Sequence, residues 1–332
     1  MEFGEVPLDQ AEGAIMAHSV ELTQGRLRKG CILTPADLGR LRDQGHGRVV
    51  VARLSPEDIA EDAAADALAE ALLAGSGLLR SEAFTGRVNL NAPQAGVVEV
   101  DAQAVLALNS IDPAITLATL APLTRVSAGT LAGTVKIIAY GVGRAALALA
   151  CAAAEGALQF RPVQMRGASL VLTEVAGQDD KLSVKGQRAV EARLRALGME
   201  LTGCDVVAHD ARAIAGALGR AGGEMVLILT GSATSDLFDT APQGVRLAGG
   251  EVLRFGMPVD PGNLLFVGRH QGRPVVGLPG CARSLALNGA DWVLERLACG
   301  LAVGDAEIAA MGVGGLLKEI PTRPQLREPK AR

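Results

Sequence analysis

The second half of the chain alternates apolar, strand-like runs with helix-like segments, and this alternation restricts the fold more than any other feature of the sequence. Strands are expected at 168–175, 201–208, 224–230, 252–255, 264–267 and 274–278. Helices are expected at 183–197, 210–221 and 281–298, and a further short helix is expected to end within 245–250. Strands and helices that alternate in this way form a mostly parallel sheet with helices on both faces. The sequence therefore predicts an α/β domain, which we place at residues 166–300.

The first 165 residues predict a smaller α+β region whose role the sequence leaves open. Thr34 and Pro35 mark a helix start, because Thr caps helices and Pro is favoured in their first turn. The remaining elements are expected as a strand at 48–54, a helix at 55–73, strands within 84–100, a strand at 135–140 and a helix at 143–154. Residues 301–332 are expected to form a Gly-rich tail with a linker-like end at 321–332.

The composition excludes several classes of protein. The 32 basic and 36 acidic residues give a net charge of −4, without the basic excess of a nucleic-acid-binding protein. Only eight residues are aromatic (six Phe, one Tyr and one Trp), which argues against a pocket of stacked rings, whereas 41 glycines favour sites lined by backbone. No apolar run is long enough to span a bilayer, the N-terminus shows no signal peptide, and the five cysteines form no CxxC pair. We therefore expect a cytoplasmic protein with reduced thiols and without nucleic-acid or membrane partners.

Ligands of parallel sheets bind beyond the carboxyl ends of the strands, and a loop of small and hydroxylated residues follows the strand at 224–230. The loop consists of Thr230, Gly231, Ser232, Ala233, Thr234, Ser235 and Asp236, with Asp239 shortly after it. Backbone N–H groups and hydroxyls in such a loop can hold an anion, and the two aspartates could place Mg²⁺ beside it. The alternative is a polar loop that only caps the next helix through Asp239.

Two further turns are candidates for the same site. One contains Pro261, Gly262 and Asn263, and the other runs from Gly277 through Pro279 and Gly280 to Arg283 and Ser284. A Leu-Pro-Gly turn between a strand and a helix exposes N–H groups near the positive end of that helix. The residues alone leave a binding site and a purely structural turn as equal alternatives.

Weaker candidates follow the first two strands of the predicted sheet. Glu174 ends the first strand, and His209 and Asp210 end the second. Asp210 is interpreted first as a helix N-cap, and His209 as a surface histidine or one with its hydrogen bonds satisfied rather than as a ligand. Lys185 and Arg188, near the start of a helix, are expected to be solvated unless a phosphate is near.

The segment 141–146 fits the pattern GxGxxA after a predicted strand, as in dinucleotide-binding turns. No strand ending in Asp or Glu follows at about 20 residues, where the ribose partner is expected. A plain turn is therefore favoured over an NAD site.

Three of these segments, in this order and spacing, resemble the molybdopterin-binding domain of molybdopterin adenylyltransferases and molybdenumtransferases. They are the loop at 230–239, the turn at 259–263 and the Gly-Leu-Pro-Gly turn at 277–280. The runs 6–13, 255–265, 278–284 and 311–317 are similar to a branch of this family that is often fused to a nucleotidyltransferase acting on the molybdenum cofactor. The resemblance covers nearly the whole chain and implies a three-layer molybdopterin-binding domain.

The resemblance also implies a function and a set of site residues. The chain would bind molybdopterin or the molybdenum cofactor during cofactor biosynthesis, and homo-oligomers would be expected. The residues implied to bind the cofactor are Thr173, Glu174, Thr230, Gly231, Ser232, Ala233, Thr234, Ser235, Asp236, Pro261, Gly262, Asn263, Gly277, Pro279, Gly280, Arg283 and Ser284.

The chain departs from the family pattern at three places. Ser232 and Ala233 replace two loop glycines, Thr173-Glu174 stands for a longer strand-end motif, and Cys281-Ala282 replaces Asn-Pro. Two alternatives to simple binding therefore stay open. One is a Mg²⁺-dependent adenylyltransferase or molybdenumtransferase, with Asp239 and Asp210 catalytic and with Asp239 and Glu174 as metal ligands. The other is a subunit that delivers the cofactor to a separate nucleotidyltransferase or molybdoenzyme.

Overall fold

The computed structural model describes residues 1–177 and 181–317, and the chain divides into two compact units at Arg161 and Pro162. Unit 1 is Met1–Arg161 and unit 2 is Pro162–Arg332. The linker-like end predicted at 321–332 lies outside the described residues.

Unit 2 is built on a six-stranded sheet in the order β16-β15-β17-β20-β19-β18. Its strands are β15 Gly167–Glu174, β16 Glu200–Ala208, β17 Met225–Leu229, β18 Glu251–Phe255, β19 Phe266–His270 and β20 Arg273–Leu278. The first four strands in the sheet order are parallel to one another. β19 pairs antiparallel with β20 on one side and with the edge strand β18 on the other. The predicted α/β organisation with a mostly parallel sheet is confirmed.

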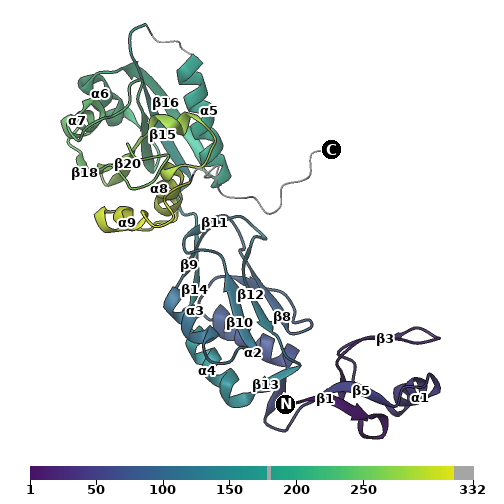
Figure 1. Ribbon diagram of the computed structural model, residues 1–332. Helices are drawn as coiled ribbons and strands as arrows, with labels where there is room; N and C mark the ends of the chain where they lie inside the picture. The colour runs from purple at the N-terminus through teal and green to yellow at the C-terminus, as the bar shows by residue number, and fades with distance from the viewer. Residues whose placement is uncertain (178–180, 318–332) are drawn as a thin grey trace. The chain divides into compact units, whose positions relative to one another are not determined.

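Helices cover both faces of this sheet (Figure 1). α5 Lys181–Ala196 and α8 Gly289–Ala298 pack on one face, and α6 Ala211–Arg220 and α7 Thr240–Leu247 pack on the other. Alternate strand residues serve the two faces because successive side chains of a strand point in opposite directions. In β17, for example, Leu227 joins the α5–α8 core, while the neighbouring Ile228 joins the α6–α7 core.

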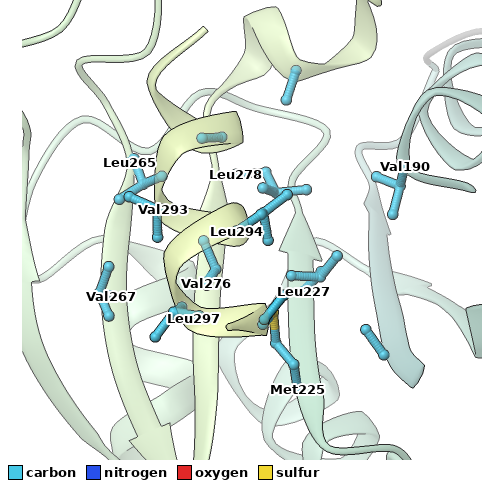
Figure 2. Packing of buried hydrophobic residues seen from close by; sticks show 14 of the residues in the cluster. Val190, Met225, Leu227, Leu265, Val267, Val276, Leu278, Val293, Leu294 and Leu297 are labelled. Carbon is cyan, nitrogen blue, oxygen red and sulfur yellow. The ribbon is translucent and has the colours of Figure 1, made fainter. Parts of the chain in front are cut away.

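The larger core of unit 2 lies between the sheet and the α5–α8 layer (Figure 2). Val190 of α5, Leu227 of β17, Val276 of β20 and Leu294 of α8 are all buried within it. Burial of one such side chain contributes about 1.5–3 kcal/mol to the free energy of folding. This layer therefore fixes the position of α5 relative to β17 and β20.

The last long helix begins later than the sequence predicts. A 3₁₀ turn, η2 Gly280–Arg283, is followed by an irregular segment, and α8 begins only at Gly289. Asn288 starts α8 because its side chain accepts the Ala290 N–H, while Asp291 accepts the Asn288 N–H. The prediction of one helix over 281–298 is therefore wrong at its start. A short helix, α9 Asp305–Ala310, lies in the predicted tail.

Unit 1 combines four helices with short sheets. In its largest sheet, β12 pairs antiparallel with β8 and β10. The elements are β1 Glu2–Pro7, η1 Leu8–Gln10, β2 Ile15–Met16, β3 Val20–Glu21, β4 Arg26–Leu27, α1 Pro35–Asp43, β5 Arg48–Arg53, β6 Asp58–Ala60, α2 Glu61–Leu73, β7 Leu79–Arg80, β8 Arg87–Asn91, β9 Gly96–Val100, α3 Ala102–Asn109, β10 Ile115–Thr119, β11 Thr124–Val126, β12 Leu131–Ile137, β13 Gly141–Gly143, α4 Arg144–Ala154 and β14 Leu158–Pro162. Thr34 caps α1 as predicted, with its hydroxyl 3.3 Å from the Asp37 N–H.

The region before α2 contradicts two expectations. The helix expected from residue 55 begins at Glu61, because β6 first pairs antiparallel with β13. Gly141 therefore lies in a strand, and a Cβ on it would come within 2.6 Å of the Leu54 side chain. Close packing explains this glycine, and the parallel βαβ turn that a dinucleotide site needs is not formed here. The NAD alternative does not hold.

Across residues 1–177 and 181–317, the structure contains no helix that is both long and apolar enough to cross a bilayer.

Candidate functional site

Three parallel strands end side by side at one edge of the unit 2 sheet. Leu172 of β15 is in register with Leu229 of β17, and Leu229 is in register with Leu278 of β20. Thr173, close to the end of β15, therefore lies next to Thr230, which follows β17, and to the predicted turn that follows Leu278. The fold thus brings together the 230–235 loop and the turn after β20, two segments that the sequence selects.

Thr173 joins the first strand end to the 230–235 loop. Its buried hydroxyl oxygen accepts the Gly231 N–H at 2.9 Å and lies 2.8 Å from Nδ1 of His209. Because the hydroxyl accepts from Gly231, its own proton is available to the histidine nitrogen. His209 is half-buried and hydrogen-bonded to the hydroxyl that fixes the loop, in agreement with the expectation of a satisfied histidine.

The predicted loop exposes consecutive backbone donors. The N–H groups of Ser232, Ala233 and Thr234 have no hydrogen-bond partner within the part of the chain that the structure describes. Ser232, Ala233 and Ser235 are exposed, while Thr230 and Thr234 are buried beneath the loop. Successive free N–H groups in a concave loop are typical of anion sites.

Asp239 holds the far end of this loop and starts α7. One carboxylate oxygen accepts from the N–H of Ser235 at 2.8 Å and from its hydroxyl at 3.2 Å, and the other accepts the Thr240 N–H at 2.6 Å. Burial alone would raise the pKa of Asp239, but these hydrogen bonds outweigh it and lower the pKa below its ordinary value. The carboxylate therefore stays charged and acts as both a cap and a loop clamp.

The other carboxylates of the predicted site are also engaged with their surroundings. Asp236 accepts the Phe238 N–H at 2.8 Å, and Asp210 caps α6 through the N–H groups of Arg212 and Ala213. The Ser183 hydroxyl donates to Glu174 at 2.7 Å.

Within residues 1–177 and 181–317, no three His, Cys, Asp or Glu residues form a group able to hold a metal ion. Asp239 and Glu174, the predicted metal ligands, therefore belong to no such group, and both oxygens of Asp239 already accept loop donors. Metal binding by Asp239 and Glu174 stays a prediction.

Arg283 links the turn after β20 to the same loop. Its Nη2 donates to the Thr230 carbonyl at 2.5 Å, whereas its buried Nε has no partner among the described residues. Burial lowers the pKa of the Arg283 guanidinium. The predicted residues Thr173, Thr230 and Arg283 are thus joined in one connected set.

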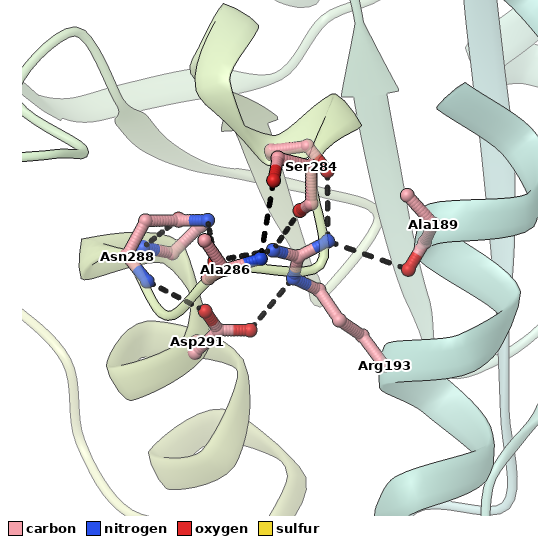
Figure 3. Close-up of polar contacts among 8 residues, drawn as sticks. Ala189, Arg193, Ser284, Ala286, Asn288 and Asp291 are labelled. Carbon is pink, nitrogen blue, oxygen red and sulfur yellow. Dashed lines mark hydrogen bonds and ion pairs between the residues drawn. The ribbon is translucent and has the colours of Figure 1, made fainter. Parts of the chain in front are cut away.

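A buried arginine that the sequence does not single out fixes this turn (Figure 3). Arg193 of α5 donates to Asp291 at 2.6 Å and to the carbonyls of Ala282 and Ser284 at 2.7 Å each. It is 8% exposed. Its only sequence signal is an arginine in the last turns of a helix, which is normally solvated. The segment 282–286 therefore owes its course to a contact from α5.

A cleft of about 620 Å³ lies between α5 and this turn. Its described lining combines four basic residues with small and aliphatic ones: Lys181, Val184, Lys185, Arg188, Ala189, Arg283, Ser284 and Leu285. Arg283 and Ser284 are predicted site residues, while Lys185 and Arg188 are expected to be solvated unless a phosphate is near. The structure places all four on one cleft.

The turn at 261–263 packs against the start of α8. The Pro261 carbonyl accepts the Gly289 N–H at 2.8 Å at the start of α8, and Asn263 lines a separate hollow of about 380 Å³ with Gly312 and Leu316. A Cβ on Gly262, at φ +138°, would lie 2.5 Å from the Gly289 nitrogen. Close packing onto α8 therefore accounts for this glycine.

Gly277 also has a packing reason. It is buried within β20 opposite Phe266, and a Cβ on it would lie 1.9 Å from that ring. Gly280, by contrast, is exposed in the turn beside Arg283, and Pro279 is buried. Of the predicted glycines, Gly231 and Gly280 lie at the strand-end site.

Comparison with known proteins gives distant matches. A family model described as a domain of unknown function (DUF8806) matches residues 5–53. The search of curated proteins returns no match. Among solved structures, the chain is similar to the molybdopterin biosynthesis MoeA protein from Pyrococcus horikosii, with 17% identity over 90% of this chain and 76% of that one, at a TM-score of 0.32. It is also similar to the CinA protein with unknown function from Thermoplasma acidophilum, with 13% identity over 40% of this chain and 98% of that one, at a TM-score of 0.32.

Proposed function

We propose that unit 2 binds molybdopterin, or the molybdenum cofactor built on it, through the phosphate group of that ligand. The observation that carries this proposal is the row of N–H groups at Ser232, Ala233 and Thr234, which have no partner among the described residues. The loop that carries them is held at Thr173 and Asp239. Backbone donors of this kind hold phosphate oxygens without needing a metal. The sequence resemblance to the molybdopterin-binding domain supports the choice of ligand.

Each residue of the site has a distinct task in this proposal. The loop N–H groups and the Ser232 and Ser235 hydroxyls donate to the phosphate, and Thr173 keeps the loop in place through Gly231. Asp239 clamps the other end of the loop. Because aromatic residues are scarce, the pterin ring would be held by hydrogen bonds at its edge rather than between stacked rings.

Calorimetry with anaerobically prepared molybdopterin tests the proposal. The wild-type chain should bind, and Thr173→Val should weaken binding by about 2- to 10-fold, because it removes one loop hydrogen bond worth about 0.5–1.5 kcal/mol. Thr202→Val, on an exposed residue of β16, serves as the control and should bind as the wild type does. No heat of binding with the wild-type chain would refute the proposal.

The same preparation tests whether the site also performs chemistry. Incubation with MgATP and molybdopterin would give an adenylylated product if the chain were an adenylyltransferase. Asp239→Asn is the informative variant, because asparagine can still cap α7 while the negative charge is lost. Unchanged binding without any product would leave binding as the function.

The partner expectations are tested on the intact chain. Capture of a nucleotidyltransferase or a molybdoenzyme by the loaded chain would support a delivery role. Light scattering after size-exclusion chromatography would show whether the chain forms the expected homo-oligomer.

A further inference from the structure

Strand β16 forms an open edge of the six-stranded sheet. In the described part of the chain it pairs with β15 on one side and with no strand on the other. None of its nine residues is buried, whereas seven of the eight residues of β15 are. Val206 is 51% exposed. An edge of this length presents unpaired backbone groups to which another strand can add.

The pairing with β15 shows which backbone groups of β16 face outward. The N–H of His209 donates to the Glu174 carbonyl at 2.9 Å, so residue 209 directs its backbone groups toward β15. Alternate residues of a strand direct their N–H and C=O groups to the same side. Residues 205 and 207 therefore also face β15, whereas Cys204, Val206 and Ala208 face away from it.

These three outward-facing residues define one register for two copies of the strand. Their positions are symmetric about Val206, so an antiparallel pair with a two-fold axis at Val206 matches all three. Val206 then exchanges both backbone hydrogen bonds with Val206 of the second copy, and Cys204 exchanges them with Ala208 of the second copy. The Ala208 carbonyl already accepts the Asp210 N–H at 2.7 Å, but a carbonyl oxygen can accept a second hydrogen bond.

The side chains favour the same register over its neighbours. An axis at Asp205 would place two carboxylates directly opposite each other, which is destabilising. An axis at Cys204 would place Val206 opposite Thr202, the extra residue of a bulge, where the ladder is disrupted. With the axis at Val206, two β-branched side chains meet at the centre, and Asp205 keeps its ion pair with Arg220 at 3.0 Å.

We propose that β16 is the interface between two copies of this chain, paired antiparallel about Val206 so that their two sheets form one continuous sheet. A second copy is the occupant because the match depends on the symmetry of β16 itself. The contact is isologous, since the same residues of both copies form it. This inference does not rest on the proposed function, because no ligand takes part in it.

Light scattering of the full chain after size-exclusion chromatography tests the interface. The wild-type chain should have twice the mass of one chain. Val206→Asp should have the mass of one chain at the same concentration, because it places two carboxylates opposite each other at the axis. Leu253→Asp is the matched control and should keep the doubled mass, because Leu253 is 37% exposed on β18, at the opposite edge of the same sheet.

Oxidative cross-linking on a non-reducing gel tests the register. Cys204 lies opposite Ala208 of the second copy, at the Cα separation of about 5.5 Å of a hydrogen-bonded pair, which a disulfide can span. A208C should therefore give a cross-linked dimer. The wild-type chain should give none, because its two Cys204 residues are offset along the strands. C204S/A208C is the control for the other cysteines and should also give none.

Each outcome supports or overturns the proposal. A wild-type chain with the mass of one copy, or a dimer that Val206→Asp leaves intact, would overturn the β16 interface. Equal dissociation by Leu253→Asp would do the same. A wild-type cross-link that C204S removes would overturn the register in favour of an axis at Cys204. If circular dichroism showed that Val206→Asp is unfolded, the cross-link of A208C would decide, and its absence would overturn the proposal.

Discussion

Replacement of Arg193 by leucine should destabilise unit 2 strongly and release the turn that forms the cleft. Arg193→Leu removes the donor to Asp291 and the donors to the Ala282 and Ser284 carbonyls. The Asp291 carboxylate would then remain in a mostly buried setting without its cation. Loss of one partner from a buried ion pair costs about 3–5 kcal/mol.

Urea unfolding followed by tryptophan fluorescence measures this loss. Trp292 is the only tryptophan of the chain and follows Asp291 in α8, so its emission reports on unit 2 at the site of the change. With a slope of about 2 kcal/mol per molar urea, a loss of 3–5 kcal/mol lowers the midpoint by roughly 2 M. Arg220→Leu is the control, because the exposed Arg220–Asp205 pair is worth about 0–1 kcal/mol.

A double-mutant cycle separates the ion pair from the carbonyl contacts. Asp291→Leu together with Arg193→Leu should cost less than the sum of the two single changes, because neither charge is then left alone. A loss below about 1 kcal/mol for Arg193→Leu, equal to that of Arg220→Leu, would refute the claim that Arg193 organises the turn.

Two further predictions concern packing and pH. Gly277→Ala should lower the free energy of unfolding of unit 2 by about 1–3 kcal/mol, because its Cβ would overlap the Phe266 ring. Gly219→Ala is the control and should cause no loss, because Gly219 lies on α6 with open space around its Cβ position. Equal thermal stability of the two variants would contradict the packing argument. In unit 1, hydrogen bonds from the Met1 amino group and from Ser55 lower the pKa of Asp58 to about 2. A lowered pKa means that this contribution is fully present above about pH 4 and is lost as the pH falls toward 2. Acid unfolding followed by circular dichroism should therefore be less steep in Asp58→Asn, and an unchanged profile would show that this carboxylate does not contribute.

Local patterns in the sequence determine much of unit 2. The alternation of apolar runs predicts its strands and helices, and the caps at Asp210 and Asp239 are confirmed because N-capping depends only on a side chain and the next three residues. The position of the 230–235 loop at a strand end is equally a local property. The role of that loop in binding stays a prediction.

The tertiary structure alone decides how these segments are used. The irregular segment 284–288 between η2 and α8 depends on Arg193, about 90 positions earlier in the chain. No local sequence pattern predicts this dependence. Gly277 and Gly262 resemble ligand-binding glycines in sequence, yet Phe266 and Gly289 explain them by close packing. Long-range contacts of this kind are invisible to periodicity and spacing.

The cleft shows the same division most clearly. The sequence identifies Lys185 and Arg283 separately, as a helix residue and a turn residue that are 98 positions apart. Only the packing of α5 against the sheet, with the buried Arg193 between α5 and the turn, brings their charges to one surface. Secondary structure follows from hydrogen bonds and side-chain periods within a few residues, whereas a binding surface depends on which distant segments the core holds together.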